Sequence, residues 1–415
     1  MRLQISSSPQ GRVLRPRQVR RANRAVILEM LRRHERLSRV DIARHTGLSE
    51  GTISRIIAEL MRRRLVAEAG SEGSTGGRPA TRLQLEPSRV AVGVDLQRWE
   101  MRFSVGTMKG RILEKHSVPT PGTPETTLAE IVQHVRAYRR QFGEDHVEGL
   151  GVSARGIVNS DTGVVELGND PDWVRVPVKE YLQSALQIPV HVENNVRLAA
   201  LAEYSYGEPE IHRCRCLLFV MVDDGVGIGI VLDGKVYHGP RMAAGEFGQM
   251  VIAASDGPER YDRHGCLEKL VGNPAVCERY NAMANIKSVT AKAETTGRVR
   301  EICRWAAEGD RAARETLHET CRYLGIGIAN VVWGLDADAV IIDGTLNEAW
   351  PLAAPWIAQQ FPAGSEILNF RDLTLRPSAL RGEAAMIGTA TLPFLRLFST
   401  GERASLVPRA ATTAA

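Results

Sequence analysis

The stretch SRVDIARHTGLSEGTISRIIAEL, residues 38–60, has the spacing of two short helices joined by a tight turn. Ser38 and Asp41 form an S-x-x-D capping box that opens the first helix. Gly47 ends this helix, because glycine adopts the left-handed backbone of such a turn at little cost. Ser49 caps the second helix. The apolar stripe of the second helix consists of Ile53, Ile56, Ile57 and Leu60. This pattern is typical of a helix-turn-helix.

The side of the second helix opposite its apolar stripe is the face that a helix-turn-helix presents to the major groove. We therefore predict that the residues contacting DNA there are Ser49, Glu50, Gly51, Thr52, Ser54 and Arg55. An amphipathic helix over residues 23–33 precedes the motif. Its apolar face is predicted to consist of Val26, Ile27, Met30 and Leu31. The alternative is a three-helix bundle without a role in DNA binding.

A glycine-rich loop follows the motif, between two short segments, 65–69 and 82–85, that we predict to be strands. A hairpin in this place is the wing of a winged helix. Gly77 and Arg78 lie in the loop, before Pro79, and are predicted to contact DNA, with the Arg78 guanidinium entering a minor groove. A flexible linker is the alternative interpretation of this loop, and the two do not exclude each other.

The charge of the chain is unevenly distributed. Residues 1–85 hold 18 Arg, no Lys and 7 acidic residues, a net charge of +11, whereas the remaining residues carry −6. A basic end is typical of a DNA-binding domain because it neutralises phosphates, although a solvated arginine-rich face has the same composition. The chain has 43% apolar residues, no apolar run long enough for a membrane span and six scattered cysteines, so we predict a globular protein of the reducing cytoplasm.

Two apolar hairpins dominate the rest of the chain. Residues 90–96 and 101–105 form the first hairpin, and residues 217–232 form the second. Mixed strand and helix patterns follow each hairpin, which predicts two α/β lobes of similar design with a ligand cleft between them.

Five segments carry a resemblance to a known family: GGRPA at 76–80, VENNVRLAALAEYSYG at 192–207, DGKVYHG at 233–239, AGEFGQ at 244–249 and GCLE at 265–268. Together with the helix-turn-helix, they make the chain resemble the transcriptional regulators of the repressor/open reading frame/kinase (ROK) family, from about residue 23 to residue 397. The resemblance implies an α/β protein with an N-terminal winged helix-turn-helix followed by a two-lobed actin-like, hexokinase-like (ASKHA) core.

The predicted boundaries follow from this fold. Residues 1–88 are the basic arm and the winged helix-turn-helix. Lobe 1 of the core covers 89–205 and is completed by a helix near 382–397, and lobe 2 covers 206–381. The tail at 399–415 is small, polar and without periodicity, so it is predicted to be disordered.

Members of the family are sugar kinases or sugar-responsive repressors, and the resemblance implies a sugar site between the lobes. Its predicted residues are Arg155, Gly156, Asn169, Asn194, Asn195, Glu246, Gln249 and Glu268. Side chains of these types recognise ring hydroxyls through hydrogen bonds. Taken singly, an exposed Glu or Asn is ordinarily only solvated, so the prediction depends on their clustering within the family motifs.

The phosphate-handling parts of the family kinases are replaced in this chain. Residues 95–100 (DLQRWE) stand where a kinase has a D-x-G-G-T-K phosphate loop, and Asp223 and Asp224 stand in the second phosphate loop. Asn195 replaces the catalytic Asp, and an amide cannot accept the substrate proton. At the adenosine side, only one glycine remains, after Asp343. The resemblance therefore implies a core without catalytic residues. An active ATP-dependent sugar kinase with an appended DNA-binding domain is the alternative.

Many family members hold a structural zinc with one His and three Cys. Gln249 occupies the His position, and Glu259 and Tyr261 occupy two of the Cys positions, so only Cys266 remains. One thiolate does not hold a structural zinc. We predict no metal and no cofactor, and we interpret the C-x-C at 214–216 as an ordinary part of the core.

The sequence thus predicts a bacterial transcriptional regulator, and more specifically a repressor of carbohydrate-metabolism genes. Its predicted partners are double-stranded operator DNA, a sugar or sugar-phosphate effector, and a second copy in a homodimer, with a tetramer as the alternative. No membrane partner is predicted. A constitutive DNA-binding protein with a vestigial sugar pocket is the remaining alternative.

Overall fold

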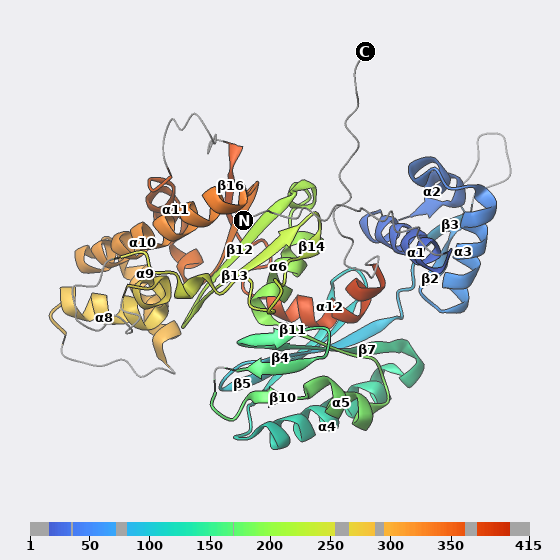
Figure 1. Cartoon of the computed structure of the whole chain (residues 1–415), viewed down its shortest axis with the longest axis horizontal. Helices are drawn as coiled ribbons and strands as arrows, with labels where there is room; N and C mark the ends of the chain where they lie inside the picture. Colours follow the sequence, from blue (N-terminus) through green and yellow to red (C-terminus); the bar gives the residue numbers. More distant parts are fainter. Residues whose placement is uncertain are drawn as a thin grey trace, which may run out of the picture. The chain divides into compact units, whose positions relative to one another are not determined.

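The computed structural model describes residues 16–34, 36–71, 81–168, 170–253, 265–286, 294–361 and 372–398 (Figure 1). They belong to two compact units: an N-terminal unit up to Arg89 that also takes in the end of the last helix from Phe394, and a core from Val90 to Pro393. Three predicted site residues, Gly77, Arg78 and Asn169, lie outside the described residues, as does the tail at 399–415. No helix in these ranges is both long enough and apolar enough to cross a membrane.

The N-terminal unit consists of three helices and a three-stranded antiparallel sheet. The helices are α1 (Pro16–Arg33), α2 (Arg39–Thr46) and α3 (Glu50–Arg62). The strands pair in the order β1 (Leu37–Ser38), β3 (Thr81–Leu85) and β2 (Val66–Ser71). The predicted helix-turn-helix is α2 and α3, and the predicted wing strands are β2 and β3. The winged helix-turn-helix is therefore confirmed, with a first helix that begins at Pro16 rather than at residue 23.

Local hydrogen bonds set the ends of α2 and α3. The Ser38 hydroxyl accepts a hydrogen bond from the Asp41 amide (3.1 Å), and the Asp41 carboxylate accepts one from the Ser38 amide (3.0 Å), which is the predicted capping box. Gly47 ends α2 with a φ of 68°. Ser49 caps α3 by accepting a hydrogen bond from the Thr52 amide (3.4 Å). The predicted apolar stripe of α3 is fully buried.

The prediction for the apolar face of α1 is wrong at one position. Val26 keeps 44% of its surface exposed, whereas Leu28 is buried beside Ile27 and Leu31. Successive helix residues lie about 100° apart, so Ile27, Leu28 and Leu31 form one stripe and Val26 lies on the other side of the helix. Both sides of α1 carry apolar residues here, and the packing against β3 and α2 determines which side is buried.

The first lobe of the core is built on a five-stranded sheet with the order β6-β5-β4-β7-β11. Three strands are antiparallel: β4 (Val90–Leu96), β5 (Glu100–Thr107) and β6 (Ile112–Pro119). β7 (Val147–Ala154) and β11 (Val190–Asn194) run parallel to β4. The apolar faces of α4 (Pro124–Phe142) and α5 (Val178–Leu186) complete its core. A small antiparallel sheet follows β7 and consists of β8 (Ile157–Asn159), β9 (Val164–Leu167) and β10 (Val174–Val176).

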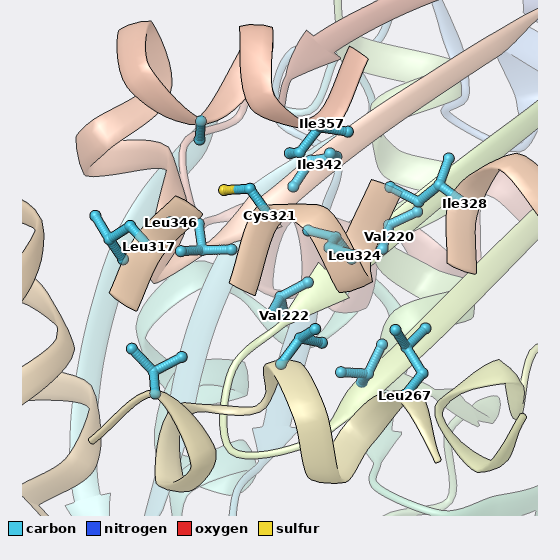
Figure 2. Close-up of a cluster of buried hydrophobic side chains, with 14 of the residues drawn as sticks. Val220, Val222, Leu267, Leu317, Cys321, Leu324, Ile328, Ile342, Leu346 and Ile357 are labelled. Atoms are coloured by element: carbon cyan, nitrogen blue, oxygen red, sulfur yellow. The ribbon is translucent and has the colours of Figure 1, made fainter. Parts of the chain in front are cut away.

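The second lobe repeats this sheet in the order β14-β13-β12-β15-β16. Its strands are β12 (Cys216–Val222), β13 (Val226–Leu232), β14 (Lys235–Val236), β15 (Ala339–Gly344) and β16 (Thr374–Pro377). Its helices are α7 (Leu267–Val271), α8 (Asn273–Met283), α9 (Thr295–Glu308), α10 (Arg311–Leu335) and α11 (Trp350–Ala358). Figure 2 shows side chains of α10, such as Leu324, meeting Val220 and Ile342 of the sheet. The same strand order in both lobes confirms the predicted duplicated fold.

The two lobes exchange their last helices. α6 (Asn195–Tyr206) follows β11 of the first lobe but packs on β12 and β13 of the second. α12 (Ala384–Phe398) follows β16 of the second lobe, and its Thr389 and Ala390 lie against the sheet of the first. The predicted lobe boundaries at residues 205 and 381 stay a prediction.

Glycines in the two sheets make room for these helices. A Cβ atom at Gly229 of β13 would lie 2.4 Å from the Cβ of Ala200 in α6, and one at Gly93 of β4 would lie 2.4 Å from the amide nitrogen of Ala390 in α12. Neither distance is possible between real atoms, so only glycine lets the helices approach this closely. The glycine at 229 is therefore explained by packing, without a role in phosphate binding.

Candidate functional site

The exposed face of α3 carries the residues predicted to contact DNA. The fully exposed members of this set are Ser49, Glu50, Gly51, Ser54 and Arg55. Thr52 is half-buried, and its hydroxyl accepts a hydrogen bond from the Ser49 hydroxyl (2.9 Å). A Cβ atom at Gly51 would meet no atom within 4 Å, so nothing in the described chain covers this part of the helix. Short side chains followed by an arginine suit a close approach to base edges.

Basic side chains outside the predicted set are also exposed on α2 and α3. Arg62 is exposed at the end of α3, and Arg44 and His45 are exposed on α2. Arg62 follows Arg55 by seven residues, which is about two helical turns, so both side chains leave the same side of α3. That spacing is the signal that could have identified Arg62 in advance.

Ion pairs hold α3 and the wing strand against the other helices. Glu59 of α3 pairs with Arg20 (2.6 Å) and Arg24 (2.7 Å) of α1, and Asp41 of α2 pairs with Arg82 of β3 (2.7 Å). Burial alone would raise the pKa of Glu59, but the two guanidinium groups lower it. Hydrogen bonds from the capping serine, and then the charge of Arg82, lower the pKa of Asp41. Pairs this close to the surface contribute about 0–1 kcal/mol each, so they orient the helices more than they stabilise the unit.

In the core, the junction between β11 and α6 gathers several predicted sugar-site residues. Asn194 caps α6, because its Oδ1 accepts hydrogen bonds from the amides of Val196 (2.9 Å) and Arg197 (3.1 Å). Its Nδ2 donates to the carbonyl oxygen of Gly156 (2.9 Å). The structure therefore holds the Arg155–Gly156 turn next to the start of α6 through the Asn194 amide.

A buried ion network lies beside this junction. The Glu193 carboxylate is 3.0 Å from Arg197 and 2.8 Å from His238. Arg197 also donates to the carbonyl oxygens of Val158 (2.9 Å) and Met242 (3.2 Å). Burial would raise the pKa of Glu193, but His238 and Arg197 lower it to about 2. The network joins β11 and α6 to the loop after β14. The sequence analysis missed it, although Glu193 and Arg197 stand four residues apart in the quoted motif.

Two predicted carboxylates lie close to this network. Glu268 of α7 lies under the β12–β13 turn, where its Oε2 accepts a hydrogen bond from the Val226 amide (3.2 Å). Burial raises the pKa of Glu246, the charge of Arg197 opposes the rise, and the neighbouring Glu268 carboxylate adds to it. Gln249 lies on the same loop as Glu246 and is exposed.

Asn195 is the first residue of α6 and is half-buried. Its Nδ2 lies 3.8 Å from the Sδ of Met221 in β12, so it sits where the two lobes meet. The structure thus gathers Asn194, Asn195, Glu246 and Glu268 around Arg197 and the start of α6. Carboxylates accept hydrogen bonds and amides both donate and accept them, which is the combination that binds hydroxyl groups.

In the second lobe, the β12–β13 turn and the end of β15 carry the carboxylates of Asp223, Asp224 and Asp343. Asp223 accepts a hydrogen bond from the Thr345 hydroxyl (3.2 Å), and Asp224 accepts one from Thr295 (2.6 Å). Burial raises the pKa of Asp223, and it raises that of Asp343 to about 6. A phosphate at this place would meet carboxylates rather than backbone amides, and like charges repel.

The corresponding turn of the first lobe is also unlike a phosphate loop. Asp95, at the end of β4, is buried and accepts hydrogen bonds from Gln97 Nε2 (2.9 Å) and from the Ser153 hydroxyl. Its carboxylate is therefore held by side chains of its own lobe. Arg98 and Trp99 follow it, with the Arg98 guanidinium 4.8 Å from the centre of the Trp99 ring.

No group of three or more His, Cys, Asp or Glu side chains within the described ranges is placed to hold a metal ion. Of the positions compared with a zinc site, Glu259 and Tyr261 lie outside those ranges, and Cys266 is buried. None of the six cysteines, all of which lie in the described ranges, forms a disulfide. Cys216 is buried in β12, and Cys214 is half-buried just before it.

Comparisons with known proteins agree with this architecture. The model of the ROK family matches residues 91–393, and a model of winged helix-turn-helix DNA-binding domains matches residues 22–66. The chain is 24% identical to the xylose repressor of Caldicellulosiruptor bescii over 406 residues, which cover 93% of this chain and 98% of that protein.

Solved structures match as well. A ROK family transcriptional regulator, a homologue of the Escherichia coli MLC protein, has a TM-score of 0.80 and 24% identity, over 92% of this chain and 98% of that one. A ROK family glucokinase from Streptomyces griseus, in complex with glucose and AMPPNP, has a TM-score of 0.60 and 24% identity, over 73% of this chain and 98% of that one. These matches confirm the predicted fold class.

Proposed function

The chain belongs to the ROK family, and from that premise we propose that it is a DNA-binding transcriptional repressor of carbohydrate-metabolism genes that responds to a sugar or sugar-phosphate effector. One observation carries the proposal. A single chain joins a winged helix whose α3 face is exposed to a core that gathers amide and carboxylate side chains near the start of α6 and carries Asp223 and Asp224 in its β12–β13 turn. The similarity to a xylose repressor along nearly the whole chain supports the same class of protein.

For DNA binding, α3 enters the major groove with Ser54 and Arg55 toward the base edges. Arg62 and the wing residue Arg78 contact the flanking backbone and minor groove. Two copies in a homodimer place two α3 helices on half-sites about 34 Å apart, so the operator is a palindrome. The net charge of +11 on residues 1–85 supports this part of the proposal.

For effector binding, the sugar lies between the lobes and hydrogen-bonds to Asn195, Glu246 and Glu268. The other proposed members of the site are Arg155, Gly156, Asn169, Asn194 and Gln249. In this scheme Asn194 acts mainly by holding the Gly156 turn, because its amide already makes three hydrogen bonds.

The crossover helices are the proposed route between the two sites. α6 begins at Asn195 in the sugar site and packs on the second lobe. α12 belongs to the core through Pro393 and to the N-terminal unit from Phe394. An effector that binds one arrangement of the lobes better than another shifts the protein toward that arrangement. Through α12, the shift changes the affinity for the operator.

The proposal excludes sugar kinase activity. Asn195 cannot accept the substrate proton, and Asp223 and Asp224 repel nucleotide phosphates. A coupled assay for ADP release, run over hexoses, pentoses and amino sugars, should give no turnover above background. Steady ADP release with any of these sugars would instead support a kinase with an appended DNA-binding domain.

Operator binding is the direct test. The purified chain is screened for thermal stabilisation by free and phosphorylated sugars, and its binding to genomic DNA fragments is measured with and without each sugar that stabilises it. We expect a palindromic site whose affinity falls at least tenfold with one sugar. Arg55→Ala should lower operator affinity by about 1–3 kcal/mol, whereas Glu268→Gln should preserve operator affinity and abolish the sugar response. Operator binding that no sugar changes would support the constitutive alternative.

A further inference from the structure

A small pocket in the first lobe has features that a site for a single sugar ring does not explain. Its polar wall is formed by Gln97, Arg98, Thr120, Arg155 and Asp170, and Trp173 closes one side. The cavity volume is about 40 Å³. Sites that enclose a whole small molecule usually measure roughly 300 Å³ or more. The pocket therefore accepts a polar substituent, and the body of the ligand that carries it lies outside, on the rim.

The rim of the pocket carries an aromatic ring in a fixed position. Trp99 is 60% exposed at the end of the β4–β5 hairpin. Its carbonyl oxygen accepts a hydrogen bond from the amide of the pocket residue Thr120 (3.1 Å). The guanidinium of Arg98 lies 4.8 Å from the centre of the ring and is held in turn by Asp170 (3.2 Å). The ring is thus oriented by two pocket residues, while most of it remains available to a ligand.

The opposite side of the rim is aliphatic. Val165 of β9 lines the pocket, and Leu167, two residues further along the strand, lies on the same face of the small sheet. Leu167 pairs directly with Val174 of β10. Leu167 is 52% exposed and Val174 is 49% exposed, so the buried face of this sheet continues outward as an apolar surface beside the pocket.

Single exposed apolar side chains are normal on protein surfaces. Here each of the three is the chain neighbour of a residue that lines one pocket, and that lining combines apolar with polar residues. An apolar surface combined with a few polar groups is the usual composition of a small-molecule site. The hairpin end that carries Trp99 also replaces the glycine loop that would bind phosphate in a kinase, so no nucleotide competes for this place.

We propose that the effector is a glycoside rather than a free monosaccharide, and that its aglycone stacks on Trp99 and lies against Leu167 and Val174. This inference rests on the proposed function, because it places the first sugar ring in the site between the lobes. The aglycone is a second sugar ring or an aryl group, since both present a flat face to an aromatic ring. A polar substituent of the aglycone enters the pocket and hydrogen-bonds to Gln97 and Thr120.

The test compares matched ligands by calorimetric titration of the full chain. Each common pentose and hexose is supplied as its methyl glycoside, its phenyl glycoside and a disaccharide with the same non-reducing ring. We expect at least one extended ligand to bind about tenfold more tightly than its methyl glycoside. If only the disaccharide binds more tightly than the methyl glycoside, the aglycone is a second sugar ring. If only the phenyl glycoside does, the aglycone is an aryl group.

Variants of Trp99 then test whether this side chain is the source of the higher affinity for extended ligands. Trp99→Ala should remove the tenfold advantage and leave the methyl glycoside within twofold of the parent, and Trp99→Phe should retain most of the advantage. Tyr181→Ala is the matched control, because Tyr181 is also an exposed aromatic of the first lobe (42%) but lies on α5, outside the pocket lining. An unchanged melting temperature confirms that each variant is folded.

Two results would overturn the inference and leave the proposed function standing: equal affinity for methyl and extended glycosides, or an advantage that survives Trp99→Ala. If no glycoside binds, the inference fails, while the screen with free and phosphorylated sugars still decides the effector part of the proposed function and operator binding decides the DNA-binding part.

Discussion

The two lobes have the same strand order but hold their buried carboxylates in opposite ways. In the first lobe, Glu193 at the end of β11 lies between Arg197 and His238, and its pKa falls to about 2. In the second lobe, Asp343 near the end of β15 forms no ion pair with the described residues, and burial raises its pKa to about 6. Glu193 is therefore a buried charge with ion-pair partners, whereas Asp343 is a buried carboxylate held at an energetic cost.

The largest expected effect comes from breaking the ion pair between Arg197 and Glu193. Arg197→Met removes the guanidinium from the buried Glu193 carboxylate, which keeps His238 and the Asn194 amide as partners, so we expect the free energy of unfolding to fall by about 3–5 kcal/mol. Urea unfolding at pH 7 measures this. The double variant Arg197→Met, Glu193→Gln should recover part of the loss, because no uncompensated charge remains.

The matched control for this prediction is Arg215→Ala. Arg215 also forms an ion pair, with Asp233 (3.2 Å), but both side chains are well exposed. Its removal should change the free energy of unfolding by no more than about 1 kcal/mol. A loss at Arg197 as small as the loss at Arg215 would show that the network does not stabilise the first lobe.

The two lobes should respond alike where packing, not charge, is altered. Gly93→Ala and Gly229→Ala each force a Cβ atom to within 2.4 Å of a crossover helix, and we expect each to cost about 1–3 kcal/mol. Thermal unfolding compares them with Gly297→Ala in α9, where a Cβ atom meets nothing within 4 Å and alanine favours the helix. A large cost in one lobe only would contradict the equivalence of the two helix–sheet interfaces.

Removing the charge of Asp343 should stabilise the fold, whereas breaking the ion pairs of Glu193 should destabilise it. Because the folded pKa of Asp343 is about 6, above its ordinary value of 3.8, ionisation of this group destabilises the fold at neutral pH. Asp343→Asn should therefore stabilise the protein by roughly 1–2 kcal/mol at pH 8. The advantage should shrink as the pH falls from 6 to 4 and be small at pH 4, where the parent carboxyl is protonated in the folded state and partly protonated in the unfolded state.

Urea titrations of the parent and of Asp343→Asn at pH 8, 6 and 4 measure this advantage. For Glu193 we expect the opposite dependence of the free energy of unfolding on pH. Its lowered pKa stabilises the fold above about pH 4.5, and that stabilisation is lost as the pH falls toward 2. An advantage of Asp343→Asn that is the same at all three pH values would mean that hydrogen bonding, and not charge, sets its effect.

Local signals in the sequence were enough for the helix-turn-helix and for the hairpin that begins the sheet of each lobe. The Ser38 capping box and the Gly47 turn depend on residues within about four positions of each other in the chain. Each of the two hairpins forms part of one of the two five-stranded sheets. The buried network was out of reach, because Glu193 and His238 are 45 residues apart and meet only after both lobes have formed. The exposure of Trp99 likewise depends on the folded hairpin, since tryptophan is on average a highly buried residue type.

The smallest expected effect is that of a substitution at Asn195. It tests whether the carboxylates in the turns of the second lobe prevent kinase activity. Asn195→Asp introduces a carboxylate where the resemblance to the family kinases implies a catalytic base, while the turns of the second lobe stay as they are. We expect no ADP release above background even with saturating ATP and effector, because Asp223 and Asp224 still repel the nucleotide phosphates and Asp95 is still held by Gln97 and Ser153. Asn195→Ala serves as the control without a base. Turnover that appears in Asn195→Asp alone would mean that the acidic turns still admit a nucleotide, and that one amide, and not the second lobe, separates this chain from a kinase.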